Sequence, residues 1–145
     1  MGRVINPEGV GKERTQLLRS VVLALRELMQ QNTADNMTKD LAAYIALALQ
    51  AISETVEVSV AAWEKRDYWL KADRFRMEWA WAGRLGENMR KAVLADNWPL
   101  VAETAAAIAE KVKKTEVPKR HGLGTPWEGA WNRLQTLSLS KPGER

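Results

Sequence analysis

The sequence contains few of the side chains that usually carry out catalysis or bind metal ions. Its 145 residues include no cysteine and a single histidine, His121. The lack of cysteine excludes disulfides, iron–sulfur clusters, thiolate metal sites and cysteine nucleophiles. A dinuclear metal site in a helical bundle normally needs two Glu-x-x-His motifs, which one histidine cannot supply. We therefore expect a protein that has no metal, no cofactor and no enzymatic activity.

Two further patterns could suggest chemistry, and neither favours a site. Gly9-Val10-Gly11-Lys12 resembles the end of a phosphate-binding P-loop. However, Asn6 stands where the first glycine belongs, and Glu13 stands where serine or threonine belongs. Glu54 is the carboxylate best placed for acid–base chemistry, because the apolar pattern described below predicts its burial. We interpret Glu54 as a polar residue that sets the helix register or borders the apolar seam.

Aromatic residues are concentrated in one segment that also carries many charges. Four of the seven tryptophans lie between residues 63 and 81, together with Tyr68 and Phe75. Ion pairs between residues three or four apart on a helix can account for the charges. These pairs are Asp67–Lys71, Arg74–Glu78 and Asp73–Arg76. The aromatics indicate either a core or a protein interface, since tryptophan and arginine are enriched at binding hot spots. The candidate partner-binding residues are Trp63, Arg66, Trp69, Leu70, Arg74, Met77 and Trp81.

A second candidate surface comes from the charge distribution. The net charge is +4, and residues 111–145 hold eight basic and three acidic side chains, which makes this part of the chain the basic one. A cluster of this kind can contact the phosphates of nucleic acid or an acidic partner. Alternatively, its lysines complement a helix dipole next to a solvated loop. The candidate residues are Lys113, Lys114, Lys119, Arg120 and His121.

The spacing of apolar residues predicts that helices position both candidate surfaces. Neither glycine nor proline occurs between Lys12 and Ala82, and these residues are the usual markers of turns. An amphipathic pattern predicts a first helix at about 12–31, followed by a polar loop. A later helix at about 98–114 begins with Asp96 or Asn97 as cap and Pro99 in its first turn. A short helix at about 126–137 follows a capping-box pattern, Thr125 to Glu128, and should dock through Trp127 and Trp131.

A heptad pattern dominates the middle of the chain. Alternating steps of three and four residues from Tyr44 to Val93 give fifteen positions, of which thirteen are apolar or small. The two exceptions are Glu54 and Lys65. This repeat favours one long helix from about 38 to 95, which would be about 85 Å long and could be kinked. The alternative is a four-helix bundle with a tight connection around residues 65–67.

The same segment has a second apolar stripe on its opposite face. Leu49, Val56, Trp63, Leu70 and Met77 recur at every seventh position. A helix that is apolar on two faces needs cover on both. We expect Tyr68, Phe75 and Trp79 on the first seam to lie in the core. Either the C-terminal tryptophans or another molecule should cover the second stripe. Gly83 and Gly86 indicate a close helix contact or a local break.

Together these patterns predict an all-α protein. The expected architecture is an antiparallel bundle of three to four main helices around a long, possibly kinked central helix, with a short C-terminal helix. Residues 1–137 should form one domain, and residues 138–145 a frayed tail. The longest uninterrupted apolar run, residues 41–49, is too short to span a membrane, so we expect a cytoplasmic location. We predict an interaction or assembly protein that binds a protein partner or itself, and nucleic-acid binding is the alternative.

Overall fold

The computed structural model describes residues 9–139, and this part of the chain is built from helices without strands. The helices are α1 (Val10–Leu28), α2 (Asn36–Lys65), α3 (Trp69–Leu94), α4 (Trp98–Val112) and α5 (Ala130–Leu139). The predicted all-α bundle is therefore confirmed. Ser138 and Leu139 still belong to α5, whereas the rest of the predicted frayed tail lies outside the described residues.

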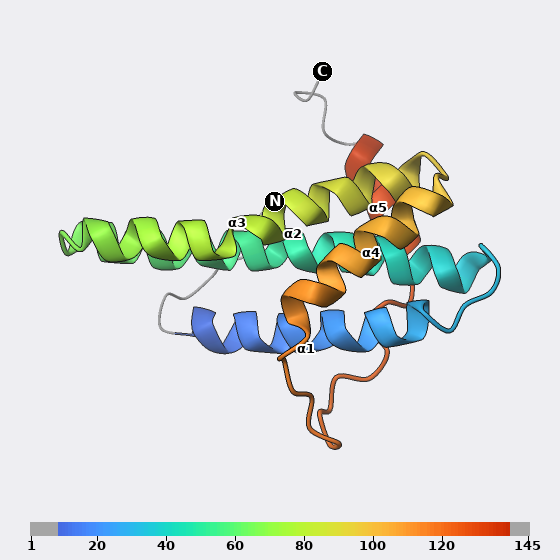
Figure 1. Ribbon diagram of the computed structural model, residues 1–145, viewed down its shortest axis with the longest axis horizontal. Helices are drawn as coiled ribbons and strands as arrows, with labels where there is room; N and C mark the ends of the chain where they lie inside the picture. The colour runs from blue at the N-terminus through green and yellow to red at the C-terminus, as the bar shows by residue number, and fades with distance from the viewer. Residues whose placement is uncertain (1–8, 140–145) are drawn as a thin grey trace.

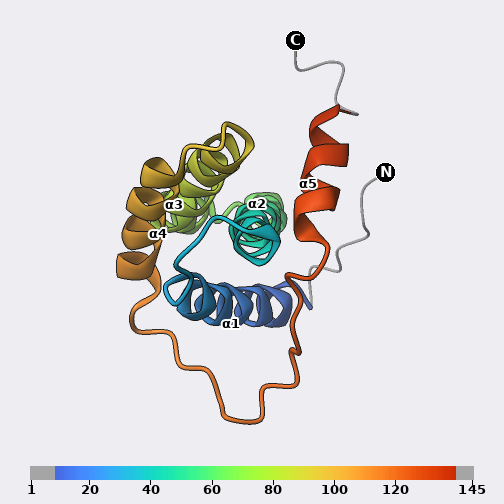
Figure 2. The ribbon, with the colours of Figure 1, turned by 90° about the vertical axis from the view of Figure 1, so that its right-hand side faces the viewer.

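The long helix α2 lies at the centre of the bundle. Viewed nearly along α2, the helices α1, α3 and α5 surround it on three sides, and α4 packs against α3 and α1 (Figure 2). Successive helices α1, α2 and α3 run antiparallel to one another (Figure 1). The fully buried aliphatic residues of α2 face these neighbours and form the main core. They are Leu41, Ile45, Leu49 and Ile52.

The predicted continuous helix from about 38 to 95 is wrong, because the chain reverses direction at residues 66–68. Asp67 adopts a left-handed backbone conformation with φ of 64°. The amide of Tyr68 donates to the carbonyl of Trp63 at 2.9 Å, and the amide of Asp67 donates to that of Glu64 at 3.0 Å. This is a Schellman helix end, in which glycine usually takes the left-handed position. Aspartate tolerates that conformation, so the turn leaves no glycine or proline signal in the sequence.

The end of α3 repeats this arrangement. Asp96 has a φ of 57°, and the amide of Asn97 donates to the carbonyl of Ala92 at 2.9 Å. The side chain of Asn97 then accepts from the amide of Leu100 and caps α4, which confirms the cap predicted there. Both connections that hold α3 in place are therefore short turns closed by backbone hydrogen bonds, with aspartate instead of glycine.

The heptad seam assigned from the sequence is not the core face of α2. Its positions Glu54, Ala61 and Lys65 are exposed, whereas Leu49 and Val56 from the second stripe are buried. After the turn the repeat does mark the buried face of α3, where Ala72, Ala82, Gly86, Met89 and Val93 are buried, whereas in α2 the second stripe faces the neighbouring helices. The second stripe of α2 is therefore covered by other helices of the same chain, and Glu54 is not a buried acid.

Two glycines allow α3 to approach α2 closely. A Cβ atom added to Gly86 would lie 2.9 Å from the Cβ of Leu49, and one added to Gly83 would lie 3.1 Å from the Oγ of Ser53. Contacts below 3.0 Å do not occur between real side chains, so position 86 requires glycine. The sequence left open a helix break or a close contact at these positions, and the structure confirms the contact.

The start of α5 differs from the predicted capping box. Residues 126–129 form turns, Gly129 has a φ of 80°, and the helix begins at Ala130. The cap comes from α2. The carboxylate of Asp40 accepts hydrogen bonds from the amides of Gly129 at 3.2 Å and Trp131 at 2.9 Å. A side chain about 90 positions away in sequence thus fixes the N-terminus of α5, which a local motif could not predict.

Replacing Asp40 with alanine should lower the free energy of unfolding by about 1–3 kcal/mol, because two charge-assisted hydrogen bonds to a helix end are lost. Urea denaturation followed by circular dichroism measures this change. Asp40→Asn keeps an acceptor oxygen and should lose less. Unchanged hydrogen exchange at the amide of Trp131 in Asp40→Ala would contradict the assigned cap.

The composition of α2 also meets the criteria for a membrane span. Its 30 residues contain an 18-residue window that is apolar enough to cross a bilayer, and 44% of that window is buried inside the bundle. At 18 residues the window is longer than the uninterrupted apolar run at residues 41–49, because polar residues interrupt it. The core helix of a bundle has the same composition, so the cytoplasmic location stays a prediction.

Candidate functional site

The ends of α2 and α3 project from the bundle as a two-helix arm. We define the arm as residues 55–79. In the arm, the turn at 66–68 joins the end of α2 to the start of α3. Figure 1 shows that α2 and α3 extend together well past the start of α1. Beyond that point the two helices have only each other as neighbours within the described part of the chain (Figures 1 and 2). The aromatic segment found in the sequence lies almost entirely on this arm.

A small core holds the two helices of the arm together. Val56, Val60 and Ala72 are buried, and three aromatic side chains pack against them. These aromatic residues are Trp63, Phe75 and Trp79. The rings of Trp63 and Phe75 meet edge to face with centroids 4.9 Å apart. Trp63, a predicted partner-binding residue, is thus half-buried inside the arm, where the Nζ of Lys71 lies 4.5 Å from the centre of its ring.

Arg14 of α1 joins the base of the arm to the bundle. Its Nε donates to the Oγ1 of Thr55 at 3.1 Å, and its Nη2 donates to the carbonyl of Thr55 at 3.1 Å and the Oγ of Ser59 at 2.7 Å. The guanidinium also lies 4.9 Å from the ring centre of Phe75. Partial burial lowers the pKa of Arg14. Sequence reasoning missed this role, because the contacts bring three helices together.

Within the arm, one face of α3 points away from α2. This face carries large apolar side chains that are exposed to solvent. Leu70 is 64% exposed and Met77 is 77% exposed, and the two are seven residues apart on one face of the helix. Trp69, next to Leu70, is 56% exposed. We call this surface the outer face. It consists of Trp69, Leu70, Asp73, Arg74 and Met77.

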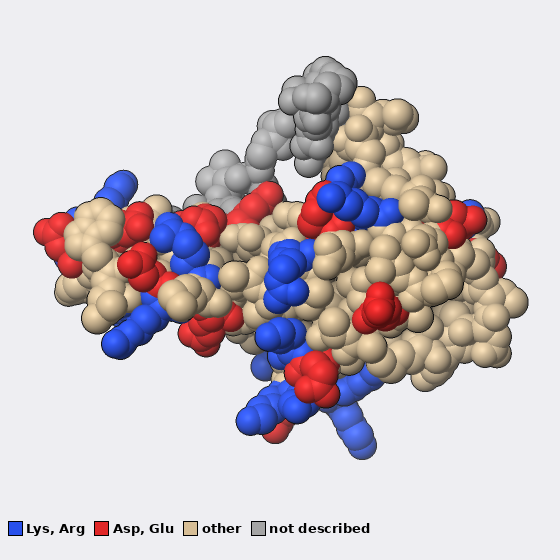
Figure 3. All heavy atoms as spheres, turned by 45° about the horizontal axis from the view of Figure 1, so that its top comes forward, with Lys and Arg blue, Asp and Glu red and all other residues tan. Residues whose placement is uncertain are grey.

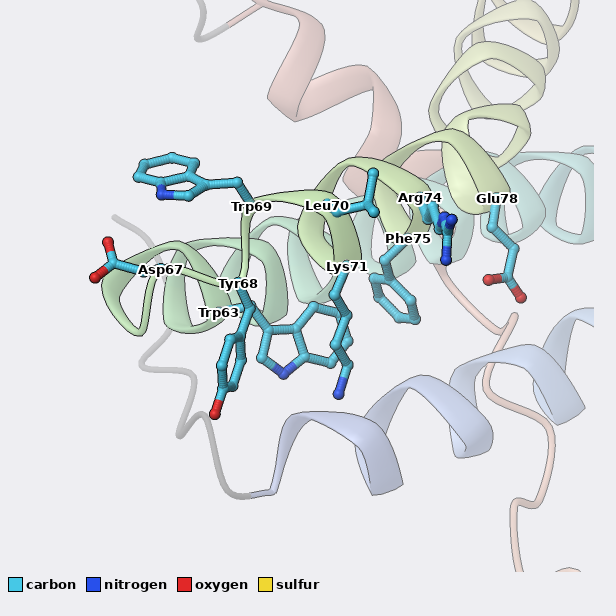
Figure 4. Close-up of a pocket in the computed structure, with 9 residues that line it drawn as sticks. All are labelled: Trp63, Asp67, Tyr68, Trp69, Leu70, Lys71, Arg74, Phe75 and Glu78. Carbon is cyan, nitrogen blue, oxygen red and sulfur yellow. The ribbon is translucent and has the colours of Figure 1, made fainter.

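An open concavity of about 770 Å³ lies at the tip of the arm. In Figure 4, Trp63, Tyr68 and Phe75 point to one side of α3, and Trp69 and Leu70 point to the other. Tyr68 is 52% exposed, so the prediction that it lies in the core is wrong. The cause is again the turn, because Tyr68 precedes α3 and does not continue the face of α2. The lining residues are Trp63, Asp67, Tyr68, Trp69, Leu70, Lys71, Arg74, Phe75 and Glu78.

The charges of the arm are only partly paired with one another. Arg76 lies 3.6 Å from Glu57, 3.5 Å from Glu64 and 3.6 Å from Asp73, which confirms the predicted Asp73–Arg76 pair. The predicted pairs Asp67–Lys71 and Arg74–Glu78 are not formed within 4.0 Å in the described structure. Arg74 therefore faces solvent from the outer face without an ion-pair partner among residues 9–139.

Two of the predicted partner-binding residues lie outside the outer face. Arg66 is the exposed residue that follows α2 at the turn. Trp81 is half-buried and stacks on Trp79 with ring centroids 5.9 Å apart, so part of its surface is used within the chain. The C-terminal tryptophans do not cover the arm, because α5 docks on α2 and Trp127 is buried in the main core.

The basic cluster lies at the end of α4 and in the following link. Lys113 is the C-cap residue that follows α4, and its Nζ forms an ion pair with Glu110 at 3.1 Å. His121 is half-buried, and its Nδ1 accepts a hydrogen bond from the amide of Leu123 at 3.0 Å. Lys114, Lys119 and Arg120 are exposed. Figure 3 shows Lys and Arg side chains gathered along the lower edge of the molecule, with acidic groups among them. Nucleic-acid binding by this cluster stays a prediction.

Residues 9–139 contain no cluster of three His, Asp or Glu side chains that could hold a metal ion. The segment that resembles a P-loop does not form a loop around an anion, because Gly11 and Lys12 lie in the first turn of α1. In comparisons with known proteins, the chain matches no protein-family model, no curated protein and no solved structure. Its function can therefore be inferred only from its own geometry.

Proposed function

We propose that this protein is a non-enzymatic assembly protein that binds a protein partner through the outer face of its arm. The observation that carries the proposal is the exposure of Leu70 and Met77, 64% and 77%, on the same side of α3. Isolated exposed apolar residues are common on soluble proteins, but contiguous apolar patches often mark binding sites. Here Trp69 extends the surface next to Leu70.

The size of the exposed apolar surface supports this function. Trp69, Leu70 and Met77 on the outer face are each more than half exposed. With an aromatic side chain of about 150–250 Å² and aliphatic ones somewhat smaller, this amounts to on the order of 400 Å². The largest apolar patch on a typical monomer is about 300–600 Å² and is often functional.

The outer side of α2 in the arm differs from that of α3. Its exposed residues within the arm are Glu57, Ala61 and Lys65, and two of these three are charged. Charged residues are depleted at the centre of protein interfaces, whereas aromatic residues and methionine are enriched. A partner should therefore contact the α3 side of the arm.

The arm is also held in one conformation before a partner binds. The Schellman turn fixes its tip, the cluster around Val56, Val60 and Ala72 fixes its interior, and Arg14 fixes its base. A rigid binding surface loses less conformational entropy on association than a flexible one.

The proposal is tested by affinity purification from cells that naturally make the protein. The baits are the wild type, the double variant Leu70→Glu/Met77→Glu, and Leu139→Glu as a control that changes another exposed leucine, 87% exposed, on α5. We expect an identified protein, which can be the chain itself, to be recovered about tenfold less with the double variant and equally well with the control. Equal recovery by all three correctly folded baits would contradict the proposed function.

A further inference from the structure

The bundle contains a second candidate site at the end opposite the arm. A pocket of about 380 Å³ lies between the end of α1, the connection to α2 and the first turns of α4. In Figure 1 these segments lie at the other end of α2 from the turn at 66–68. We infer that this pocket binds a neutral, mainly apolar small molecule. The inference goes beyond the proposed function, because the pocket and the arm share no residue.

Three helices and one connection form the pocket. Viewed nearly along α2, the connection between α1 and α2 runs beside α4 (Figure 2). The inner lining includes Thr38 of α2 and Val101 and Ala105 of α4, which are all buried. Met29, which is 62% exposed, and Ala106 line the pocket where it opens to solvent. Pockets of about 300–1,000 Å³ between the helices of a bundle are common sites for small ligands.

Trp98 provides an aromatic wall in a fixed position. Its ring is half-buried and packs against the main core. The Nε1 of Trp98 donates to the Oδ1 of Asp96 at 2.6 Å, and Asp96 is held in the turn that ends α3. A ring that is already fixed loses little conformational freedom when a ligand stacks against it. The wall therefore favours a ligand with a planar ring.

The lining of the pocket selects against charged ligands. Within residues 9–139, every side chain that lines it is uncharged. The other cavities described differ, because Arg74 lines the concavity at the arm tip and Arg90 lines a cleft beside α5. A charged group that enters the uncharged pocket would lose hydration without gaining an ion-pair partner. A neutral ligand avoids this cost.

One polar side chain of the lining is available to orient the ligand. The hydroxyl of Thr38 already donates to the carbonyl of Thr33 at 2.6 Å, and the Nε2 of Gln31 donates to the carbonyl of Glu27 at 3.2 Å. The carboxamide of Asn32 has no hydrogen-bond partner among the described residues. A carboxamide both donates and accepts, so it can bind one amide, hydroxyl or carbonyl group of a ligand.

The volume of the pocket limits the size of the ligand. Because a water molecule takes about 30 Å³ in the liquid, the pocket holds roughly a dozen groups of that size. A compound of two fused rings with one polar substituent has about these dimensions. Small side chains at Ala102, Ala105 and Ala106 keep this space open, since longer side chains there would fill it.

Two probes that differ only in charge test the inference. Indole-3-acetamide is neutral at neutral pH, whereas indole-3-acetate has the same rings and carries a carboxylate. Each is titrated into the isotope-labelled full-length protein, and amide resonances are followed by NMR. We expect the acetamide to shift the amides of Ala102 and Ala105 with a Kd of about 1 mM or lower, as for a fragment of this size. The acetate should bind at least about tenfold more weakly.

A pair of variants on α4 tests the location of the site. Ala106→Trp places a large side chain at the opening of the pocket and should weaken acetamide binding about tenfold. Ala107→Trp makes the same change at an exposed neighbour that does not line the pocket, so its Kd should stay within about twofold of wild type. Both positions are exposed, so both variants should keep the fold, which circular dichroism checks.

Three outcomes would overturn the inference. They are the absence of saturable shifts up to about 5 mM acetamide, equal affinity for the acetate, or equal affinity of the two tryptophan variants. The arm variant Leu70→Glu/Met77→Glu should bind the acetamide as the wild type does. Failure of the pocket to bind would therefore leave the proposed function of the arm standing, and loss of the arm's partner would leave the pocket standing.

Discussion

Replacing Trp127 with alanine is expected to lower the free energy of unfolding by about 3–5 kcal/mol. The side chain is only 6% exposed and lies in the main core with Ala130 and Leu134 of α5. Its removal leaves a cavity in the main core next to the start of α5. Because small domains are stable by only about 5–15 kcal/mol, the loss should be visible as a large shift of the urea midpoint.

Trp69→Ala is the matched control, because it removes the same side chain from a position that is 56% exposed. We expect its free energy of unfolding to change by no more than about 0.5 kcal/mol when measured at a concentration too low for association. Equal losses for the two variants would mean that α5 does not dock through Trp127. A large loss for Trp69→Ala would mean that the arm is folded against something within the chain.

The second large effect is expected for Gly86→Val, which should lower the free energy of unfolding by about 2–3 kcal/mol. The new Cβ would lie 2.9 Å from the Cβ of Leu49, which is fully buried and cannot move aside. The helices α2 and α3 would have to separate along their contact in the core. Urea denaturation followed by circular dichroism measures the change.

Gly83→Ala serves as the control on the same helix. Its Cβ would meet only the Oγ of Ser53, at 3.1 Å, and a hydroxyl can rotate away. Alanine is also a better helix former than glycine by about 1 kcal/mol. We therefore expect Gly83→Ala to be neutral or slightly stabilising. A destabilisation as large as that of Gly86→Val would show that the two contacts do not differ as described.

Local sequence signals predicted those parts of the fold that depend on near neighbours. The fold class followed from helical periodicity, the cap of α4 from Asn97, and the close helix contact from Gly83 and Gly86. The turn between α2 and α3 could not be placed firmly, because Asp67 occupies a position where glycine is the usual signal. Because the heptad count read that turn as helix, it put Tyr68 in the core, whereas Tyr68 is exposed.

The sequence identified the segment that carries the candidate site, but not which of its side chains are exposed together. The sequence grouped Trp63, Trp81, Leu70 and Met77 on one helix face, whereas the reversed chain keeps the two tryptophans half-buried and leaves the aliphatic pair outside. The position of Arg14 against Thr55 and Phe75 depends on how three helices meet. The spacing of residues within one helix cannot predict a contact of this kind between three helices.

The Asp40 cap also sets an order in which the protein can fold. Its hydrogen bonds join residues 89 and 91 positions apart, whereas α1, α2 and α3 pack through contacts with their neighbours in sequence. Contacts of large sequence separation form late, because a long loop must close first. During synthesis the side of α2 that receives α5 therefore stays uncovered until Trp131 has left the ribosome. In that interval the nascent chain carries an apolar surface that the finished protein does not expose.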